Sequence, residues 1–268
     1  MKLSDTFIPT AGAVGLLPML IYALLLVALA ALLAQAALLL GSRALVQAGG
    51  QWRQLGLGTA ALVMALVYAC VAHGYGSLLA ELATVTDGAD RQTLFREAYP
   101  ALTQYRYMGW LVALPLLVPG VMGLAAPASP VPNQALRMGL IGSLLLVMAW
   151  FIGEQQLTFD QEMETTPRLL WGVAGAAGYG LLLRTLLRVR QGLTDGVTAG
   201  QAYGLAVRLV AAMGGIWLLV YAGMAFGLPA PVGLVLNTLA DLTGLLGAGL
   251  LVVWHTRLPL TQSAADGL

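Results

Sequence analysis

Seven apolar stretches separated by short polar connections constrain the fold of this chain more than any other feature. A helix needs roughly 20 apolar residues to cross the hydrocarbon core of a bilayer, where every backbone polar group must be paired within the protein. We predict spans at residues 11–40, 55–80, 103–124, 135–157, 168–187, 202–227 and 232–255. The expected fold is all-α, a single bundle of seven transmembrane helices over residues 1–258, followed by a short cytoplasmic tail at 259–268.

Composition supports a membrane protein and excludes several other classes. Hydrophobic residues make up 59% of the chain and charged residues 9%, whereas soluble domains carry about 25% charged residues. A net charge of +1 offers no basic surface for nucleic acid. The single Cys70 and the lack of His and Cys at ligand spacing predict neither a disulfide framework nor a metal site. With no nucleophile and base at usable spacing, we do not expect an enzyme.

Arginines in the predicted connections indicate the orientation of the bundle. Cytoplasmic connections carry an excess of Lys and Arg, and here arginines fall in alternate connections and near the C-terminal end, at Arg43, Arg53, Arg137, Arg184, Arg188, Arg190 and Arg257. Acidic residues gather in the opposite connections, after the second and fourth spans. We therefore predict that the N-terminus is outside and the C-terminus is cytoplasmic, in a multi-pass protein of the plasma membrane.

Few ionisable side chains fall within the predicted spans. Of the twelve acids, Asp241 alone lies near the middle of a span, while Arg106 and Glu154 lie near outer ends. A charge at the bilayer centre costs about 2.5–3.5 kcal/mol on insertion scales, so Asp241 is a functional candidate. It is either a proton or cation site, or an anchor that pairs with Arg106 and nearby tyrosines. We favour the pairing, because a hydrogen-bonded ion pair suffices to explain an acid at this depth.

Aromatic side chains and one histidine also lie within the spans. The tryptophans of four different spans either form a cage for a flat apolar ligand or fill the core and the membrane interface: Trp110, Trp150, Trp171 and Trp217. His73 of the second span is either a group that titrates near neutral pH or, as we favour, a hydrogen-bonded core residue.

The third span contains a specific motif. It begins Arg106-Tyr107 and continues to Trp110, four residues after the arginine, and Pro115, five residues further on. This pattern resembles the signature of the microbial rhodopsins. The end of the second span, His73-Gly74-Tyr75-Gly76 with Tyr68 upstream, and the Asp241 region of the seventh are also similar to that family. The resemblance covers nearly the whole chain and implies the seven-helix rhodopsin fold.

The resemblance assigns roles to individual positions. Trp110 and Trp217 would sandwich the polyene of retinal, and Tyr68 and Asp241 would lie beside its Schiff-base end. Arg106 would organise charge on the outer side of the site. The family's Trp-x-x-Tyr-Pro pattern is only loosely matched by Trp217 and Tyr221. The implied ligand-binding positions are Tyr68, Arg106, Trp110, Ala113, Pro115, Trp217, Tyr221, Asp241 and Leu245.

The departures from the family pattern bear most directly on function. Leu245 stands at the position of the retinal-bearing lysine, and the one lysine of the chain is Lys2. A Schiff base requires an amine, so we expect no covalent retinal. Gly109 stands at the counterion position and Gly120 at the proton-donor position, while Ala113 replaces a hydroxyl. We therefore also expect no light-driven proton pumping.

Three functions compete on these grounds. The first is a rhodopsin homologue that binds retinal or another apolar molecule non-covalently, or that acts in sensing or assembly. The second is a pigment-free channel or transporter for ions or small solutes that uses Asp241 and Arg106. The third is a structural protein of the bilayer that forms homo-oligomers, trimers or pentamers, as rhodopsins commonly do.

Overall fold

The computed structural model describes residues 11–42, 48–125, 131–155, 165–193 and 198–265, and within these ranges the regular structure is helical. Its helices are α1 (Ala11–Val14), α2 (Leu16–Ser42), α3 (Ala48–Leu82), α4 (Gly88–Met122), α5 (Asn133–Glu154), α6 (Thr165–Gln191), α7 (Thr198–Ala225) and α8 (Ala230–Ala265). The seven long helices correspond in order to the seven predicted spans.

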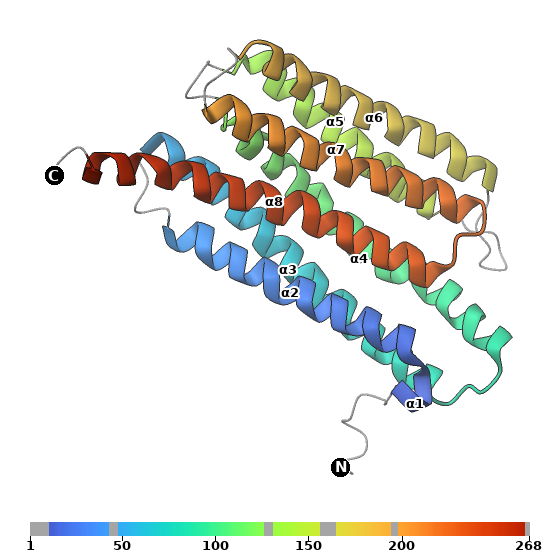
Figure 1. Cartoon of the computed structure of the whole chain (residues 1–268). Helices are drawn as coiled ribbons and strands as arrows, with labels where there is room; N and C mark the ends of the chain where they lie inside the picture. Colours follow the sequence, from blue (N-terminus) through green and yellow to red (C-terminus); the bar gives the residue numbers. More distant parts are fainter. Residues whose placement is uncertain (1–10, 43–47, 126–130, 156–164, 194–197, 266–268) are drawn as a thin grey trace.

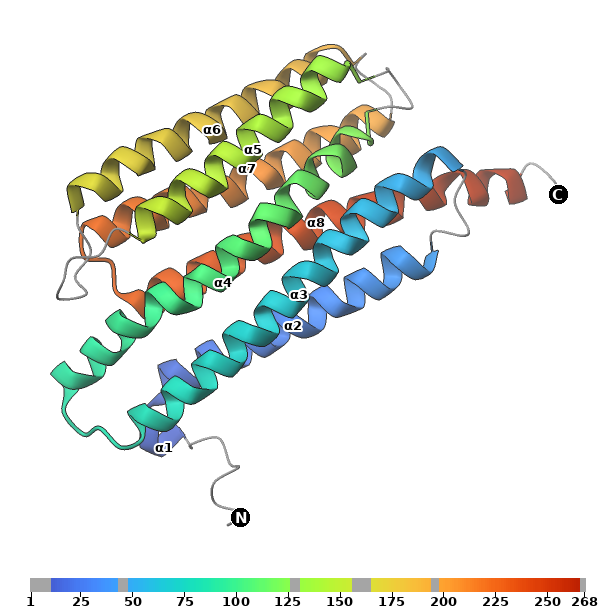
Figure 2. The ribbon, with the colours of Figure 1, turned by 180° about the vertical axis from the view of Figure 1, so that it is seen from behind.

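The long helices lie side by side in one bundle (Figure 1), and their contacts close a ring in chain order. Each contacts the next from α2 to α8, and α8 returns to pack against α2. Helix α8 also contacts α3 and α4, so it borders the interior of the bundle. Figure 2 shows from behind that α4 runs between the α2–α3 pair and the α5–α6 pair. Side chains of α3, α4, α7 and α8 can therefore meet at the centre.

One span and one connection differ from the prediction. The first span is interrupted at Gly15, which lies between α1 and α2. Its φ of 96° is positive, a conformation that glycine adopts without strain. The extended outer connection predicted after the second span is mostly helix, because α4 begins at Gly88 rather than near residue 103. The Asp87 side chain caps α4 by accepting from the Ala89 N–H at 2.7 Å. The charged residues before the predicted span at 103–124 suggested a loop. A helix that extends beyond the hydrocarbon core of the bilayer can carry such residues.

Other helix ends agree with the prediction to within a few residues, except in α3 and α8. Helix α3 starts at Ala48 and α8 continues to Ala265, into the segment predicted as a tail at 259–268; residues 266–268 lie outside the described part. By length and hydropathy, six of the described helices can cross a membrane: α2, α3, α5, α6, α7 and α8. Helix α4 is not among the six; it is less apolar because it carries Arg106, tyrosines and three prolines.

Glycines bring α5 and α6 into close contact. A Cβ added at Gly178 would lie 2.5 Å from the Leu146 backbone nitrogen, and one added at Gly142 would lie 2.8 Å from the Leu182 nitrogen. Both distances are too short for a real side chain, so the two backbones approach as closely as small residues permit. Gly172 and Gly175 of α6 make room for two large rings, those of Tyr221 from α7 and Trp150 from α5.

Candidate functional site

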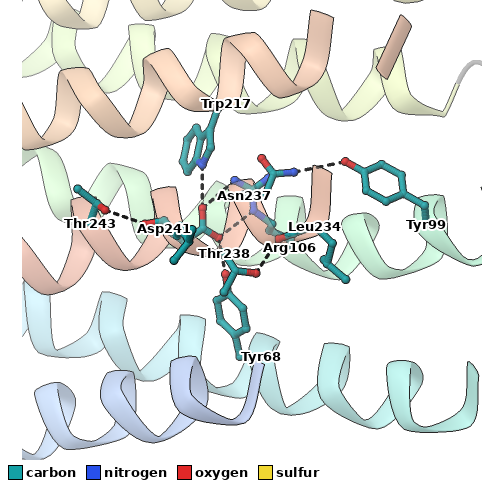
Figure 3. Close-up of polar contacts among 10 residues, drawn as sticks. Tyr68, Tyr99, Arg106, Trp217, Leu234, Asn237, Thr238, Asp241 and Thr243 are labelled. Atoms are coloured by element: carbon teal, nitrogen blue, oxygen red, sulfur yellow. Dashed lines mark hydrogen bonds and ion pairs between the residues drawn. The ribbon is translucent and has the colours of Figure 1, made fainter. Parts of the chain in front are cut away.

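Asp241 of α8 lies at the centre of a buried polar group. Its Oδ2 accepts from Arg106 Nε at 2.8 Å and from the Tyr68 hydroxyl at 2.9 Å. Its Oδ1 accepts from Arg106 Nη2 at 2.7 Å and from Trp217 Nε1 at 2.8 Å. Figure 3 shows these side chains converging on the carboxylate from α3, α4 and α7. We call Tyr68, Arg106, Trp217 and Asp241 the central cluster; the predicted pairing of Arg106 with Asp241 is present.

In the central cluster the two opposite charges are paired, and the side chains are buried. The guanidinium meets the carboxylate through two parallel hydrogen bonds, the geometry in which arginine pairs most strongly. Arg106 also lies over the Trp217 ring, 4.8 Å from its centroid, which adds a cation–π contact. Asp241 is 1% exposed and Arg106 5%. Each carboxylate oxygen thus accepts two hydrogen bonds, so four donors converge on this one acid.

The two tryptophans expected to sandwich a polyene touch each other. The centroids of the Trp110 and Trp217 rings lie 4.7 Å apart, with an angle of 70° between their planes. A flat conjugated molecule needs about 3.5 Å of carbon–carbon separation on each face, hence about 7 Å between parallel rings. A flat molecule could therefore lie between Trp110 and Trp217 only if the two rings moved apart.

Leu245, at the expected lysine position, is packed into the core. Its side chain is fully buried, and its backbone carbonyl accepts from Gln35 Nε2 of α2 at 2.7 Å. The Gln35 side chain also lies against Gly249, where a Cβ would overlap it. A polar residue of a lipid-facing helix thus fixes α2 to α8 one turn beyond Asp241. Sequence reasoning did not single out Gln35, because a lone glutamine in an apolar run gives little indication of its partner.

Neighbouring side chains fill the space beside the glycines at the counterion and proton-donor positions. A Cβ at Gly109 would lie 2.5 Å from Val67 Cγ2 and 2.9 Å from Met64 Sδ. A Cβ at Gly120 would lie 2.6 Å from Leu57 Cγ. All three neighbours belong to α3. A side chain added at either position would have to displace these α3 side chains, so α3 and α4 pack closely at the two positions that the resemblance assigns to acids.

The remaining predicted positions lie around this centre without joining the central cluster. Ala113 is fully buried and Pro115 is partly buried in α4. Tyr221 instead belongs to a second polar group: its hydroxyl donates to the Arg168 carbonyl at 2.9 Å, and its ring stacks on Trp150 at 5.3 Å.

This second group contains a buried ion pair that the sequence analysis missed. Arg168 Nη2 lies 3.3 Å from Glu154 Oε1, and the two side chains are 1% and 2% exposed. The Arg168 guanidinium also lies over the Tyr221 ring, with its Cζ 4.8 Å from the ring centroid. Glu154 Oε2 is buried without a hydrogen-bond partner among the described residues. The sequence could have predicted this pair, because Glu154 lies near the end of one predicted span and Arg168 begins the next. Two such residues lie at the same depth in the membrane.

Two single residues complete the comparison with the sequence. The interpretation of His73 as a core residue is wrong, because its side chain is exposed on α3. Trp171 is 37% exposed, as expected of an interfacial aromatic residue. Within the described ranges, no group of three or more His, Cys, Asp or Glu side chains could hold a metal ion.

Two cavities lined by described residues lie at ends of the bundle. One of about 320 Å³ lies where α5 begins and α6 ends, and one of about 940 Å³ lies between α1, α4 and the α7–α8 connection. No residue of the central cluster lines either cavity.

These observations define a multi-pass helical membrane protein, and comparison with solved structures identifies its fold as that of the microbial rhodopsins. A thermophilic rhodopsin superposes with a TM-score of 0.72 at 18% identity, covering 94% of this chain and 97% of its own. The rhodopsin of Exiguobacterium sibiricum gives 0.71 at 15% identity, covering 90% and 97%. Xanthorhodopsin, described as a light-driven ion pump with dual chromophore, gives 0.66 at 17% identity, covering 94% and 96%. No protein-family model matches the chain, and no curated protein does.

Proposed function

We propose that this protein is a pigment-free, non-pumping binding and assembly protein of the plasma membrane, built on the rhodopsin fold. One observation carries the proposal: Trp110 and Trp217 touch directly beside the Arg106–Asp241 pair, where the resemblance places retinal. Leu245 supplies no amine for a Schiff base, and the tight packing around Gly109 leaves no place for a counterion. Without this amine and its counterion, the centre cannot form the retinal Schiff base on which a photochemical cycle depends.

The first experiment adds all-trans retinal to protein purified in lipid nanodiscs. We expect no red-shifted absorption band and no adduct after borohydride reduction. The Leu245→Lys variant should also stay colourless, because its new amine faces a closed centre; Leu245→Met is the matched control for packing at this buried position. A visible chromophore in Leu245→Lys would refute the closure of the site.

Retinal bound non-covalently is the main alternative to a closed centre, and the same nanodisc preparation tests for it. Retinal between Trp110 and Trp217 would require the rings to separate and Trp217 to give up its hydrogen bond to Asp241. Bound there, it would quench tryptophan emission in a saturable way. We expect only weak, non-saturable quenching. A saturable quench that Trp217→Phe removes would place retinal at the centre and overturn the closed-centre proposal.

A pigment-free channel or transporter is the second candidate. It is favoured by two ion pairs buried within the bundle and by the partnerless oxygen of Glu154, since ionisable groups at membrane depth commonly mark transport paths. The four hydrogen bonds on Asp241 argue against it, because a carried ion must displace some of them. Proton and cation flux into proteoliposomes that is the same for the unmodified protein and Asp241→Asn would eliminate this candidate.

A further inference from the structure

The larger end cavity combines apolar walls with a cationic side. It has a volume of about 940 Å³, near the upper end of the roughly 300–1,000 Å³ typical of ligand pockets. Its apolar lining comes from several parts of the chain, including Val14 of α1, Leu82 of α3, Phe95 of α4 and Met224 of α7. Among the described residues that line it are two arginines, Arg91 and Arg96, and none of these described residues is acidic. We call this space the end cavity.

Arg91 is held in a fixed position at the wall of the end cavity. Its Nε donates to the Val85 carbonyl at 2.8 Å, and its Nη2 donates to the carbonyls of Ala13 at 2.7 Å and Leu82 at 3.1 Å. Its Nη1 donates to the Val14 carbonyl at 3.3 Å. These acceptors orient the guanidinium but carry no formal charge, so the positive charge at the wall is not cancelled by them.

Prolines and a glycine turn shape the opposite wall. The α7–α8 connection turns at Gly227, whose φ is +88°, and continues through Leu228 and Pro229 to α8, whose first turn contains Pro231. Proline has no backbone N–H, so this wall offers few donors and is mainly apolar. Leu17 of α2, which also lines the cavity, is 53% exposed, so the cavity opens to the surroundings.

From these features we infer that the end cavity binds the carboxylate head and upper chain of a long-chain fatty acid. The positive charge of Arg91, which keeps one Nη1–H beyond its four backbone hydrogen bonds, matches a carboxylate, and the apolar walls match an acyl chain. The cavity lies at an end of the bundle, where an amphiphile in the bilayer has its polar head. This inference deepens the proposed function, because it gives the binding protein a site away from its closed centre.

The test compares palmitate with hexadecanol, which keeps the chain and lacks the charge. Binding of radiolabelled ligand to the full chain is measured in nanodiscs of zwitterionic lipid. We expect saturable palmitate binding near one per protein, at least about tenfold tighter than hexadecanol, since hydrogen bonds to charged groups are the strong ones. Equal affinities for the two ligands would overturn the inference.

Two variants locate the site. Arg91→Gln should weaken palmitate about tenfold and leave hexadecanol unchanged, while Met224→Trp should fill the cavity and abolish binding of both. Arg91 also joins three chain segments, so if Arg91→Gln fails to fold, Met224→Trp and the comparison of palmitate with hexadecanol decide. Arg137→Gln, exposed at the start of α5, is the matched control. Palmitate binding that Met224→Trp leaves intact would refute the site.

A change of lipid distinguishes a fatty acid from a phospholipid as the ligand of the end cavity. Displacement of palmitate when phosphatidylglycerol replaces zwitterionic lipid would show that a phospholipid headgroup is the ligand and would overturn the fatty-acid assignment. Unchanged binding in those discs supports it. Retinal absorbance and tryptophan quenching report on the centre, so failure of this inference leaves the closed-centre result unaffected, and the reverse also holds.

Discussion

A double-mutant cycle on Arg106 and Asp241 tests the central cluster most directly. At the 2.7 Å between Arg106 Nη2 and Asp241 Oδ1, two unit charges attract by about 6 kcal/mol at an effective dielectric constant of about 20. Desolvation offsets part of that attraction, but removing one partner leaves the other charge buried and unpaired. Arg106→Gln and Asp241→Asn should therefore each lower the free energy of unfolding by about 3–5 kcal/mol.

The double variant should lose less stability than either single variant, because it leaves no buried charge. The coupling energy would then exceed the loss of either single variant, so it would be more than about 3 kcal/mol, above the usual range for contacting residues. Tyr68→Phe removes one neutral donor from Asp241 and should cost only about 0.6 kcal/mol, as is typical of hydrogen bonds between membrane helices. The assay is equilibrium unfolding in mixed micelles with increasing SDS, with Arg137→Gln as the control. Additive losses in the double variant would refute the reasoning.

Three more predictions follow from the packing. Gly178→Ala should lower the SDS midpoint by forcing α5 and α6 apart, whereas Gly180→Ala, with open space at its Cβ position, should leave it unchanged. Gly109→Asp should destabilise the protein and give no light-driven pH change in liposomes with retinal; a stable, pumping variant would contradict the packing of α3 against α4. Arg168→Met should cost about 3–5 kcal/mol by leaving Glu154 unpaired, and the Arg168→Met/Glu154→Gln variant should recover much of that loss.

Most of the fold could be predicted because hydropathy and membrane thickness together fix the length of a span. The seven long helices follow the seven predicted stretches, and the exceptions lie where a helix leaves the hydrocarbon. Helix α4 starts at Gly88 because Asp87 caps it, and its charged first turns carry no apolar periodicity to reveal them. The orientation of the bundle stays a prediction.

The site was only partly predictable, because sequence identifies which residues are unusual but not how far apart they lie. A single acid in an apolar span indicated that Asp241 needs a partner, and Arg106 was the available cation. That Trp110 and Trp217 touch depends on the relative positions of α4 and α7, which no motif specifies. The Arg168–Glu154 pair escaped notice because each residue, taken alone, looked like the end of a span.

Charge balance explains why the departures from the rhodopsin pattern belong together. Arg106 and Asp241 sum to zero, so the centre is stable without another charge. A protonated lysine at position 245 would leave one buried positive charge, and the position that the resemblance assigns to its counterion is Gly109, where α3 leaves no space. Restoring the amine alone is therefore electrostatically unfavourable, and restoring the acid alone is sterically unfavourable. Recovery of photochemistry would need at least three coordinated changes: a lysine at 245, an acid at 109 and a smaller residue at Val67. A centre built this way is stable as a closed structure, which is why binding in this protein is better sought at the end of the bundle than at its middle.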